Sequence, residues 1–513
     1  MNSLFPCCPV ASLLLCIPLA AAPATDPPGR LHINVDDSKG QPLPCRLHLT
    51  GPDGKAVAAP GQPFWKDHFC CVGRIRLRLA PGRYRYEIER GPEHQRIAGQ
   101  LELKAGQEHT LHVRLDRIAD LKRQGWYGGD LHVHRPVEDI ELLMKAEDLH
   151  VAPVITWWNR TNRWKDQPRP RDLLRRFDGD RYAHLMAGED ERGGGALLYF
   201  HLDEPLPITE AKREHPSPLT FVAEATKRNR KVWIDIEKPF WWDVPVWLAS
   251  GQMDSIGLAN NHMCRRTVYA TEAWGRPRDE RRLPPPLGNG QWTQEIYYHI
   301  LNCGFRLPPS AGSASGVLPN PVGYNRVYVH VEGAFTYEKW WRGLKGGRSF
   351  VTNGPLLLGT ADGYLPGHVF KAEAGKPLQL HLDLSLITND RVKVIEVIQN
   401  GQVVQRIPCE DRLSQSRTAK LTVRESGWFL VRAIADDVAT FRFASSAPFY
   451  VEVGKQDRRI SKASVRFFLE WIDERLTQLE KALPDAAQRR EVLWTHTQAR
   501  QFWKELAGKA NAD

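Results

Sequence analysis

Apolar and polar residues alternate with period two over residues 30–117, and this pattern predicts a β-sandwich. Residues 31–35 and 74–79 are the clearest runs, with apolar side chains on one face only. Such alternation is typical of half-buried strands. The Pro81-Gly82 dipeptide supplies a turn signal between two of them.

Residues 125–367 follow a different pattern, in which stretches of helical spacing precede short apolar runs. Residues 140–149 precede the run 151–155, and residues 219–229 precede the run 232–235. Alternating helices and strands predict βαβ units, arranged as an α/β barrel or a layered sheet.

The period-two pattern returns over residues 376–455 and predicts a second β-module. Asn400-Gly401 separates two apolar runs there, and this dipeptide is typical of a hairpin. Over residues 460–510 the apolar residues recur at helical spacing, with Pro484 between two expected helices. We therefore expect a multidomain α/β plus β protein with a helical tail.

The first residues resemble an export signal. Residues 10–22 are apolar and small residues follow, so we expect cleavage after about residue 24 and a periplasmic or extracellular protein. Cys16 raises the alternative of a lipid anchor, which we rank second because bulky leucines precede it. No later apolar stretch reaches ~20 residues, so no transmembrane span is expected. Export permits disulfides, and Cys45 could pair with Cys70 or Cys71.

The chain is basic, with a net charge of +10. Such a charge is compatible with a nucleic-acid partner or with an ordinary soluble protein. The 70 Lys and Arg residues are scattered among 60 acidic ones, and no long basic run occurs. We therefore expect no nucleic-acid partner.

The sharpest chemical motif is Asp130-Leu131-His132-Val133-His134. On a strand, His132 and His134 would share one face about 7 Å apart, close enough for two imidazoles to ligate one metal ion. Two surface histidines are the alternative explanation. The position of the pair at the start of the α/β region favours the metal, because active sites of barrels lie beyond strand ends.

This motif resembles the opening segment of the PHP (polymerase and histidinol phosphatase) metallohydrolases, in particular the carbaryl-hydrolase-like CehA/McbA branch. Residues 186–191 resemble the segment that supplies a bridging carboxylate in that family, and residues 198–201 resemble the strand that brings another histidine. Residues 347–355 resemble the closing segment of the branch.

The resemblance implies a distorted β/α barrel of PHP type over residues 125–367. It also implies two flanking modules. The first is a transthyretin-like β-sandwich, since the turn Pro81-Gly82-Arg83-Tyr84 is similar to that of such modules, and the second is a C-terminal β-module. The chain departs from the family pattern at residues 156–159, 237–239 and 313–316, where ligands are normally supplied. We therefore expect a reduced site that holds one or two divalent metal ions.

The donors that remain are histidines and carboxylates, a mixture that suits zinc, manganese or iron. Glu189 and Glu191 are catalytic candidates, and either could correspond to the family carboxylate. Asp235 and Glu237 could instead form salt bridges. The metal-ligand candidates are His132, His134, His201, Asp235, Glu237 and His262.

Three further residues are candidates for substrate binding. Trp157 and Trp158 could line the pocket or fill the core. Arg326 could hold an anionic group of the substrate or be structural.

Together these features predict an exported metal-dependent hydrolase, acting through a metal-activated water on an ester, amide, carbamate or phosphate bond. Its substrate would be a small molecule or carbohydrate-like. The alternative is a catalytically inactive PHP-like protein that binds a carbohydrate or a cell-surface partner. The sequence leaves the oligomeric state open.

Overall fold

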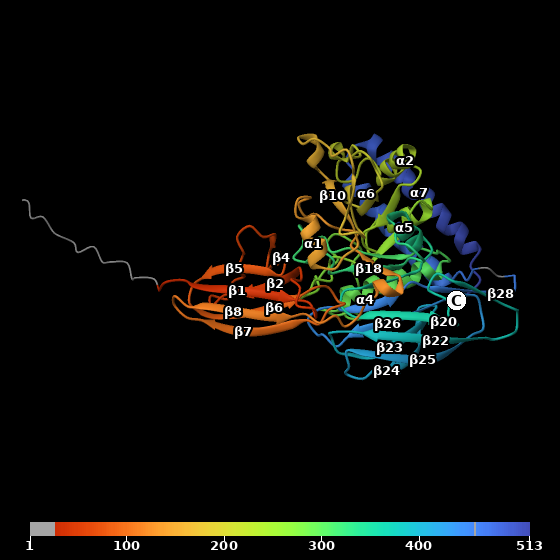
Figure 1. Ribbon diagram of the computed structural model, residues 1–513. Helices are drawn as coiled ribbons and strands as arrows, with labels where there is room; N and C mark the ends of the chain where they lie inside the picture. The colour runs from red at the N-terminus through yellow and green to blue at the C-terminus, as the bar shows by residue number, and fades with distance from the viewer. Residues whose placement is uncertain (1–25, 456–457) are drawn as a thin grey trace, which may run out of the picture.

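The computed structural model describes residues 26–455 and 458–513. The protein is a mixed α/β molecule, built mostly of strands in several sheets and ending in a pair of helices (Figure 1). The expected export signal, including Cys16, lies outside the described residues. Among the described helices, none combines the length and the apolar character needed to cross a membrane.

The N-terminal domain consists of two sheets around one hydrophobic core. In β1, Leu31, Ile33 and Val35 are fully buried and alternate with more exposed positions, as the period-two pattern predicts. One sheet contains β1 (Gly29–Asp36), β5 (Arg74–Leu79) and β8 (Glu108–Arg114). The other contains β2 (Cys45–Thr50), β3 (Phe64–Trp65), β4 (His68–Cys71), β6 (Gly82–Glu89) and β7 (Ile97–Leu103).

Cysteines in the described part of the chain are all free thiols. Cys45 lies directly opposite Cys71 in the antiparallel pair β2–β4. A hydrogen bond between these two thiols raises the pKa of Cys45. Of the two partners that the sequence left open for Cys45, Cys71 is the one that faces it across the sheet.

The central unit contains a series of neighbouring hydrogen-bonded strands, one of which runs in the opposite direction to the others. In order along the sheet they are β9 (Trp126–Gly129), β10 (Val151–Trp158), β13 (Arg181–Arg192), β14 (Gly195–Phe200), β15 (Trp233–Ile236), β16 (Ser255–Ala259) and β17 (Pro309–Ala311). Strands β9, β10 and β13 are parallel, and so are β15, β16 and β17. Strand β14 is antiparallel to both of its neighbours, so its carboxyl end lies at the opposite edge from theirs.

Helices and short segments surround these strands. Strand β16 is buried throughout, as expected for a parallel strand covered on both faces. The helices are α1 (Ile140–Ala146), α2 (Pro218–Arg228), α3 (Val244–Ser250), α4 (Gly288–Asn302) and α5 (Tyr337–Lys345). Short strands are β11 (Thr161–Asn162) and β12 (Leu174–Phe177), and 3-10 turns lie at Lys122–Gln124, Arg163–Lys165 and Ile208–Glu210.

Strands β18 (Arg326–His330) and β19 (Ser349–Thr352) connect the central unit to the C-terminal β-module. Strand β18 pairs with β9 and β19, and β19 pairs with β27 of the module. The module has its own hydrophobic core. Its strands are β20 (Leu356–Ala361), β21 (Val369–Ala372), β22 (Leu378–Ile387), β23 (Val392–Gln399), β24 (Gln402–Pro408), β25 (Ser414–Val423), β26 (Gly427–Ala435), β27 (Phe443–Ser446) and β28 (Phe449–Val453).

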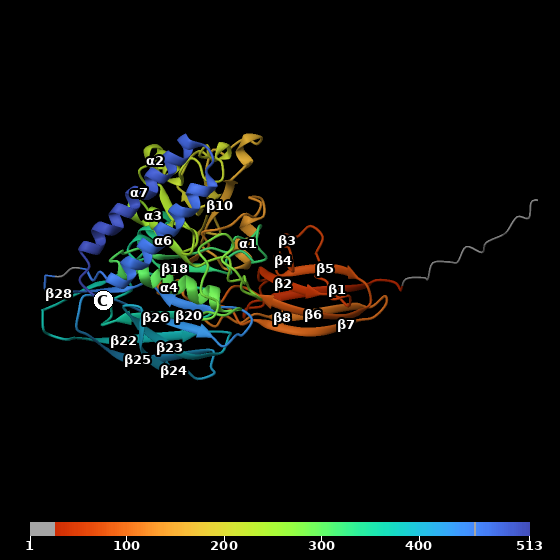
Figure 2. The same cartoon turned by 180° about the vertical axis from the view of Figure 1, so that it is seen from behind.

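The hairpin β23–β24 turns at Asn400-Gly401, as the sequence predicts. Both residues have positive φ, 50° and 87°, and glycine and asparagine tolerate this conformation best. The predicted helix pair is also present, as α6 (Lys462–Ala482) and α7 (Ala486–Gly508), with Pro484 between the two helices. Figure 2 shows both helices along the outside of the central unit, where they contact α3.

One buried carboxylate attaches the helix pair to the central unit. Asp243, just before α3, accepts hydrogen bonds from Arg475 Nε at 2.8 Å and His496 Nε2 at 3.2 Å. Its own backbone N–H donates to the carbonyl of Gly194, in the turn between β13 and β14, at 2.9 Å. Burial alone would raise the pKa of Asp243, but Arg475 and His496 hold it well below its usual range.

We expect Asp243→Ala to destabilise the docked helix pair by about 3–5 kcal/mol, because it leaves the buried Arg475 guanidinium with one carboxylate fewer. The matched control is Asp473→Ala, which removes an exposed ion pair with Arg500 and should cost no more than ~1 kcal/mol. Urea midpoints and limited proteolysis of the helices measure both. Equal effects of the two substitutions would contradict this role for Asp243.

Candidate metal centre

His132 and His134 turn their imidazoles to the same side of the extended segment that follows β9. Val133 between them is fully buried and bridges to Val154 on one side and Ser315 on the other. The Nε2 atoms of the two histidines are 2.9 Å apart. The alternation of the motif therefore places the pair as the sequence predicts.

Glu189 completes a buried triad with these histidines. Its Oε2 lies 3.4 Å from His132 Nε2 and 3.2 Å from His134 Nε2, and no side chain of the three is more than 4% exposed. Glu189 comes from the carboxyl-terminal half of β13, where parallel α/β sheets usually carry their sites. Of the two carboxylates that the sequence left open, Glu189 is the one that contacts both imidazoles.

The tautomer of His132 suits a metal ligand. Its Nδ1 lies 3.3 Å from Glu237 Oε1, and since a carboxylate only accepts, Nδ1 carries the hydrogen. Nε2 then points towards Glu189 and His134, where it can carry a second proton or, without that proton, bind a metal ion. This carboxylate–histidine arrangement is the usual way in which proteins orient a metal-binding imidazole.

The triad also attracts positive charge. Burial alone would lower the pKa of His132, but the charge of Glu189, and then Glu237, outweighs it and raises the pKa to about 10. The same contacts hold the pKa of Glu189 well below its usual range. A proton or a divalent cation can supply the charge that this position stabilises, so the residues fit a metal ion.

Glu237 orients His132, but both of its carboxylate oxygens already accept hydrogen bonds from other residues, so neither is free to bind a metal ion. Lys238 Nζ contacts both of its carboxylate oxygens. Trp241 Nε1 and Asn261 Nδ2 also donate to them, at 2.8 Å and 2.6 Å. The ammonium of Lys238, which is buried, therefore lies where a second metal ion could otherwise neutralise Glu237.

Asp130 and Ser313, which sequence reasoning did not single out for a role, fix the position of the motif. Asp130 Oδ1 accepts from the backbone N–H groups of His132 and Ser313, both at 3.0 Å, and Oδ2 accepts from the Gly323 N–H at 2.7 Å. Gly312 lets its own segment approach the motif closely, because a Cβ there would lie only 2.3 Å from the Cβ of His132. In the sequence, the one sign of this role was that Asp130 stands at the start of the 130–134 motif.

Asp235 and His262 lie close to the triad without joining it. Asp235 shares a small cavity with His132 and Glu237, but its Oδ2 accepts from the hydroxyls of Ser255 and Ser310. Burial raises the pKa of Asp235 to about 7. His262 packs against two aromatic rings, Phe240 and Tyr269, and burial lowers its pKa to about 3.

His201 is not brought to the triad. It follows β14, whose antiparallel direction carries it to the opposite end of the sheet. There its ring lies 4.6 Å from that of Trp341 and 6.2 Å from that of His184, between ring centres. The prediction of His201 as a fellow ligand came from the resemblance of residues 198–201 to a family strand, and the direction of β14 separates it from the other donors.

The two tryptophans of the predicted pocket wall point in different directions. Trp157 is 1% exposed and packs in the core, where its ring occupies the space that a side chain at Gly188 would need. The ring of Trp158 meets that of His134 edge-on, with centres 4.8 Å apart. Only Trp158 is placed to shield the triad.

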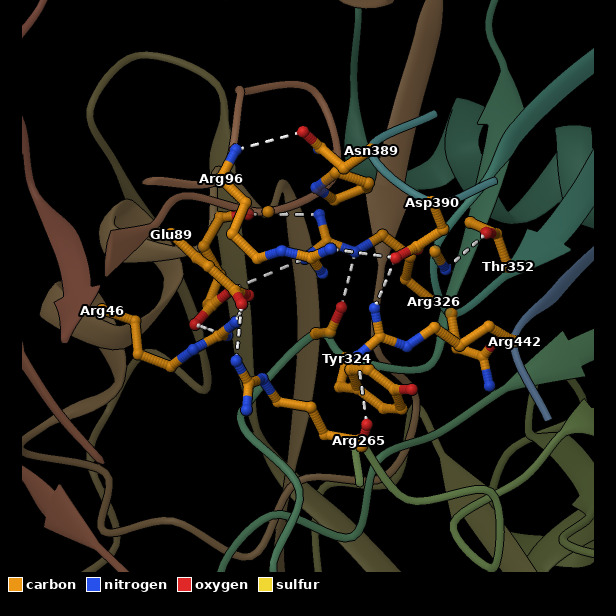
Figure 3. A pocket seen from close by; sticks show the side chains of 16 residues that line it. Arg46, Glu89, Arg96, Arg265, Tyr324, Arg326, Thr352, Asn389, Asp390 and Arg442 are labelled. Atoms are coloured by element: carbon orange, nitrogen blue, oxygen red, sulfur yellow. Dashed lines mark hydrogen bonds and ion pairs between the residues drawn. The ribbon is translucent and has the colours of Figure 1, made fainter. Parts of the chain in front are cut away.

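Arg326 lines a different cavity, of about 50 Å³, at the junction of the N-terminal domain, the central unit and the C-terminal β-module (Figure 3). It donates to the backbone carbonyls of Gly323 and Glu147, the latter at 3.1 Å. Across the same cavity Asp390 accepts from Arg96 at 3.1 Å and Arg442 at 2.8 Å. Arg326 thus contributes to the joint between domains and does not contact the histidine triad.

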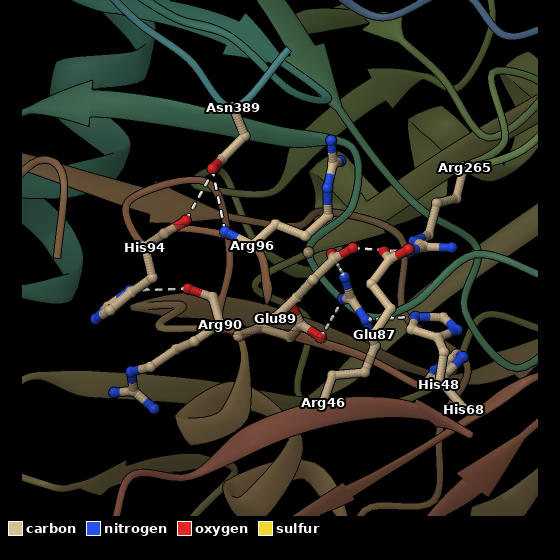
Figure 4. A network of polar contacts seen from close by, with 12 residues as sticks. Arg46, His48, His68, Glu87, Glu89, Arg90, His94, Arg96, Arg265 and Asn389 are labelled. Carbon is tan, nitrogen blue, oxygen red and sulfur yellow. Dashed lines mark hydrogen bonds and ion pairs between the residues drawn. The ribbon is translucent and has the colours of Figure 1, made fainter. Parts of the chain in front are cut away.

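A second cluster in the N-terminal domain has the donors of a metal site but the wrong tautomer. His48 Nδ1 and His68 Nδ1 lie 3.2 Å and 3.0 Å from the carboxylate of Asp67. However, Arg46 Nε donates to His48 Nε2 at 3.0 Å (Figure 4). Since arginine only donates, the hydrogen of His48 must sit on Nδ1, which cannot then bind a metal. We therefore place the candidate metal centre at His132, His134 and Glu189.

Comparisons with known proteins leave the family open. No family and no curated protein matches the sequence. Among solved structures, the CARDB domain of a Pyrococcus furiosus protein, in complex with di-metal ions, matches 20% of this chain and 89% of its own, at 15% identity and a TM-score of 0.14. The Bacillus anthracis TIE protein matches 84% of this chain over half of its own length, at 9% identity and a TM-score of 0.14. Likenesses of this size carry no argument about function.

We expect purified protein to hold about one equivalent of zinc or manganese per chain, and His132→Ala to abolish it, because one of three ligands is lost. His201→Ala is the matched control and should retain the metal. Elemental analysis after gel filtration measures both variants. If His201→Ala loses the metal and His132→Ala retains it, the metal centre lies at the other end of the sheet, and the assignment to the triad is wrong.

Proposed function

We propose that this protein is an exported metal-dependent hydrolase of the PHP type, with the central unit as a distorted PHP-like barrel. The observation that carries the proposal is the buried His132–His134–Glu189 triad, with His132 oriented by the carboxylate of Glu237. The resemblance of the 130–134 motif to the opening segment of that family supports it.

The proposal is for one metal ion. Lys238 already supplies a positive charge to Glu237, and Trp157 and Ala314 stand at positions where the family resemblance would expect ligands. A second ion would have to displace a buried ammonium from a carboxylate that also accepts two further hydrogen bonds.

A metal bound at the triad would lower the pKa of a water ligand towards ~7 and polarise the scissile group. Glu191 lies two residues from Glu189 on the same face of β13. Glu191 is therefore the carboxylate placed to take up and return the proton of that water. Trp158, edge-on to His134, excludes bulk water from that side.

These groups suit hydrolysis of an ester, amide, carbamate or phosphate bond in a small-molecule or carbohydrate-like substrate. One observation favours a second candidate function. The cavity beside His132 is only about 10 Å³, which leaves little room for a substrate. The second candidate is therefore a catalytically inactive PHP-like protein that binds a carbohydrate or a cell-surface partner.

A panel of chromogenic esters, carbamates and phosphates tests the proposal, and we expect a chelator to abolish turnover. Glu191→Gln should lower kcat by about 10²- to 10⁴-fold, because it removes the proton-transferring group. Metal content should remain that of the parent protein. Glu204→Gln, at an exposed carboxylate, is the matched control and should have no effect.

Two results separate the candidates. Full metal occupancy with no turnover on the panel would favour the inactive binder. Turnover that survives both the chelator and His132→Ala would show that hydrolysis does not arise at the triad.

A further inference from the structure

A second concave site lies at the opposite end of the central sheet from the histidine triad. It is an open cleft of about 730 Å³ between α5 and the segment that precedes β15. His184, near the start of β13, and His201, just after β14, lie at its floor. His184 lies at the amino-terminal edge of the parallel strands because it is near the start of β13. His201 lies at the same edge because β14 is antiparallel and ends there. Glu189 lies at the opposite, carboxyl-terminal edge.

The floor offers two imidazole nitrogens without protein partners. His201 Nδ1 lies 3.1 Å from the carbonyl oxygen of Lys231, so Nδ1 carries the hydrogen and Nε2 has a free lone pair. Among the described residues, neither His201 Nε2 nor His184 Nδ1 has a hydrogen-bond partner, although both atoms are buried. His184 is 7% exposed, and its burial lowers its pKa to about 3, so the ring is neutral. Buried polar atoms usually have partners, and a ligand that displaces the side chains covering these two atoms can supply them here.

Aromatic side chains hold these imidazoles in place. Tyr337 and Trp341 lie one turn apart on α5 and both line the cleft. The His184 ring is stacked parallel to that of Tyr337, with centres 6.3 Å apart, and the His201 ring meets that of Trp341 edge-on. A rigid aromatic wall with a few convergent polar atoms is the usual composition of a small-molecule pocket.

The rim of the cleft carries unpaired positive charge. Arg230, Lys231 and Arg342 are exposed and form no ion pair with any other described residue. The remaining cation, Lys345, lies 3.7 Å from Asp254, and Glu338 is the only other acidic residue of the lining. Four cations therefore face two carboxylates, and the excess favours an anionic ligand.

From these contacts we infer that the cleft binds a hydroxyl-bearing organic anion, of the class of uronic-acid sugars. One hydroxyl group of such a ligand would donate to His201 Nε2, another would pair with His184 Nδ1 as donor or acceptor according to the tautomer, and the carboxylate would lie against Arg342 and Lys231. An anion without a hydroxyl group, such as sulfate, would meet the lone pair of His201 Nε2 at the floor, which repels it. A neutral sugar would leave the rim cations unpaired. The inference does not depend on the metal centre.

Titration calorimetry with D-glucuronate, D-glucose and inorganic sulfate tests the inference. Glucuronate should bind saturably and weaken with added salt, because the rim charges are exposed to solvent. Glucose and sulfate should each bind at least about tenfold more weakly, since glucose lacks the negative charge and sulfate lacks the hydroxyl groups. His132→Ala should leave glucuronate binding unchanged.

Two variants locate the binding. His201→Ala removes an acceptor at the floor, and the double variant Lys231→Ala/Arg342→Ala removes rim charge from exposed positions where the fold does not depend on it. Each should weaken glucuronate at least about tenfold. Lys227→Ala, at an exposed lysine of α2 outside the lining, is the matched control and should have no effect.

Three outcomes would overturn the inference. One is the absence of saturable glucuronate binding to the parent protein. Another is equal affinity for glucuronate and either glucose or sulfate. The third is undiminished binding by the double variant, which keeps the test decisive even if His201→Ala fails to fold.

Discussion

A buried carboxylate needs donors on every side, and Asp130 obtains them from segments far apart in the sequence. The segment it belongs to supplies the His132 N–H, residue 313 supplies a backbone N–H and a hydroxyl, and Gly323 supplies another N–H. Asp130 is fully buried, and burial raises its pKa despite these donors. The position of His132, and with it the geometry of the triad, depends on this group of hydrogen bonds.

Local pattern was sufficient for the parts of the fold in which one strand or helix defines its own environment. Alternation along 130–134 correctly predicted that His132 and His134 share a face, and helical spacing correctly predicted the C-terminal pair of helices. The Asn400-Gly401 dipeptide marked its hairpin for the same reason. In each case the information lies within a few neighbouring residues.

Strand direction is not encoded in this local way, and the predictions that depended on it fared worse. The apolar run before His201 reads the same whether the strand is parallel or antiparallel, so the sequence could not show that β14 carries this histidine away from the triad. Lys238 could not be foreseen either, because its effect on Glu237 depends on the fold around both side chains. The buried position of Trp157 likewise depends on the glycine opposite it, Gly188.

The basic composition of the chain also has a structural use. Arg46, Arg96, Arg265 and Arg442 are grouped with carboxylates at the junction of three domains, as Figure 3 shows. Arg265 lies among so many cations that burial and then Arg46 lower its pKa to about 9. Part of the arginine that raises the net charge, including the buried Arg46 and Arg265, therefore pairs with carboxylates between domains and joins the parts of the molecule.

The turn between β13 and β14 limits how far the molecule can be shortened. Its Gly194 carbonyl is held by Asp243, and a Cβ on Gly194 would lie 2.0 Å from the Asp243 carboxylate. The same carboxylate holds α6 and α7. The helical tail is therefore coupled to the two strands on either side of this turn, one of which carries Glu189 and Glu191. A truncated protein that ends after the C-terminal β-module would lose that support, so the tail belongs to the smallest unit that can preserve the site.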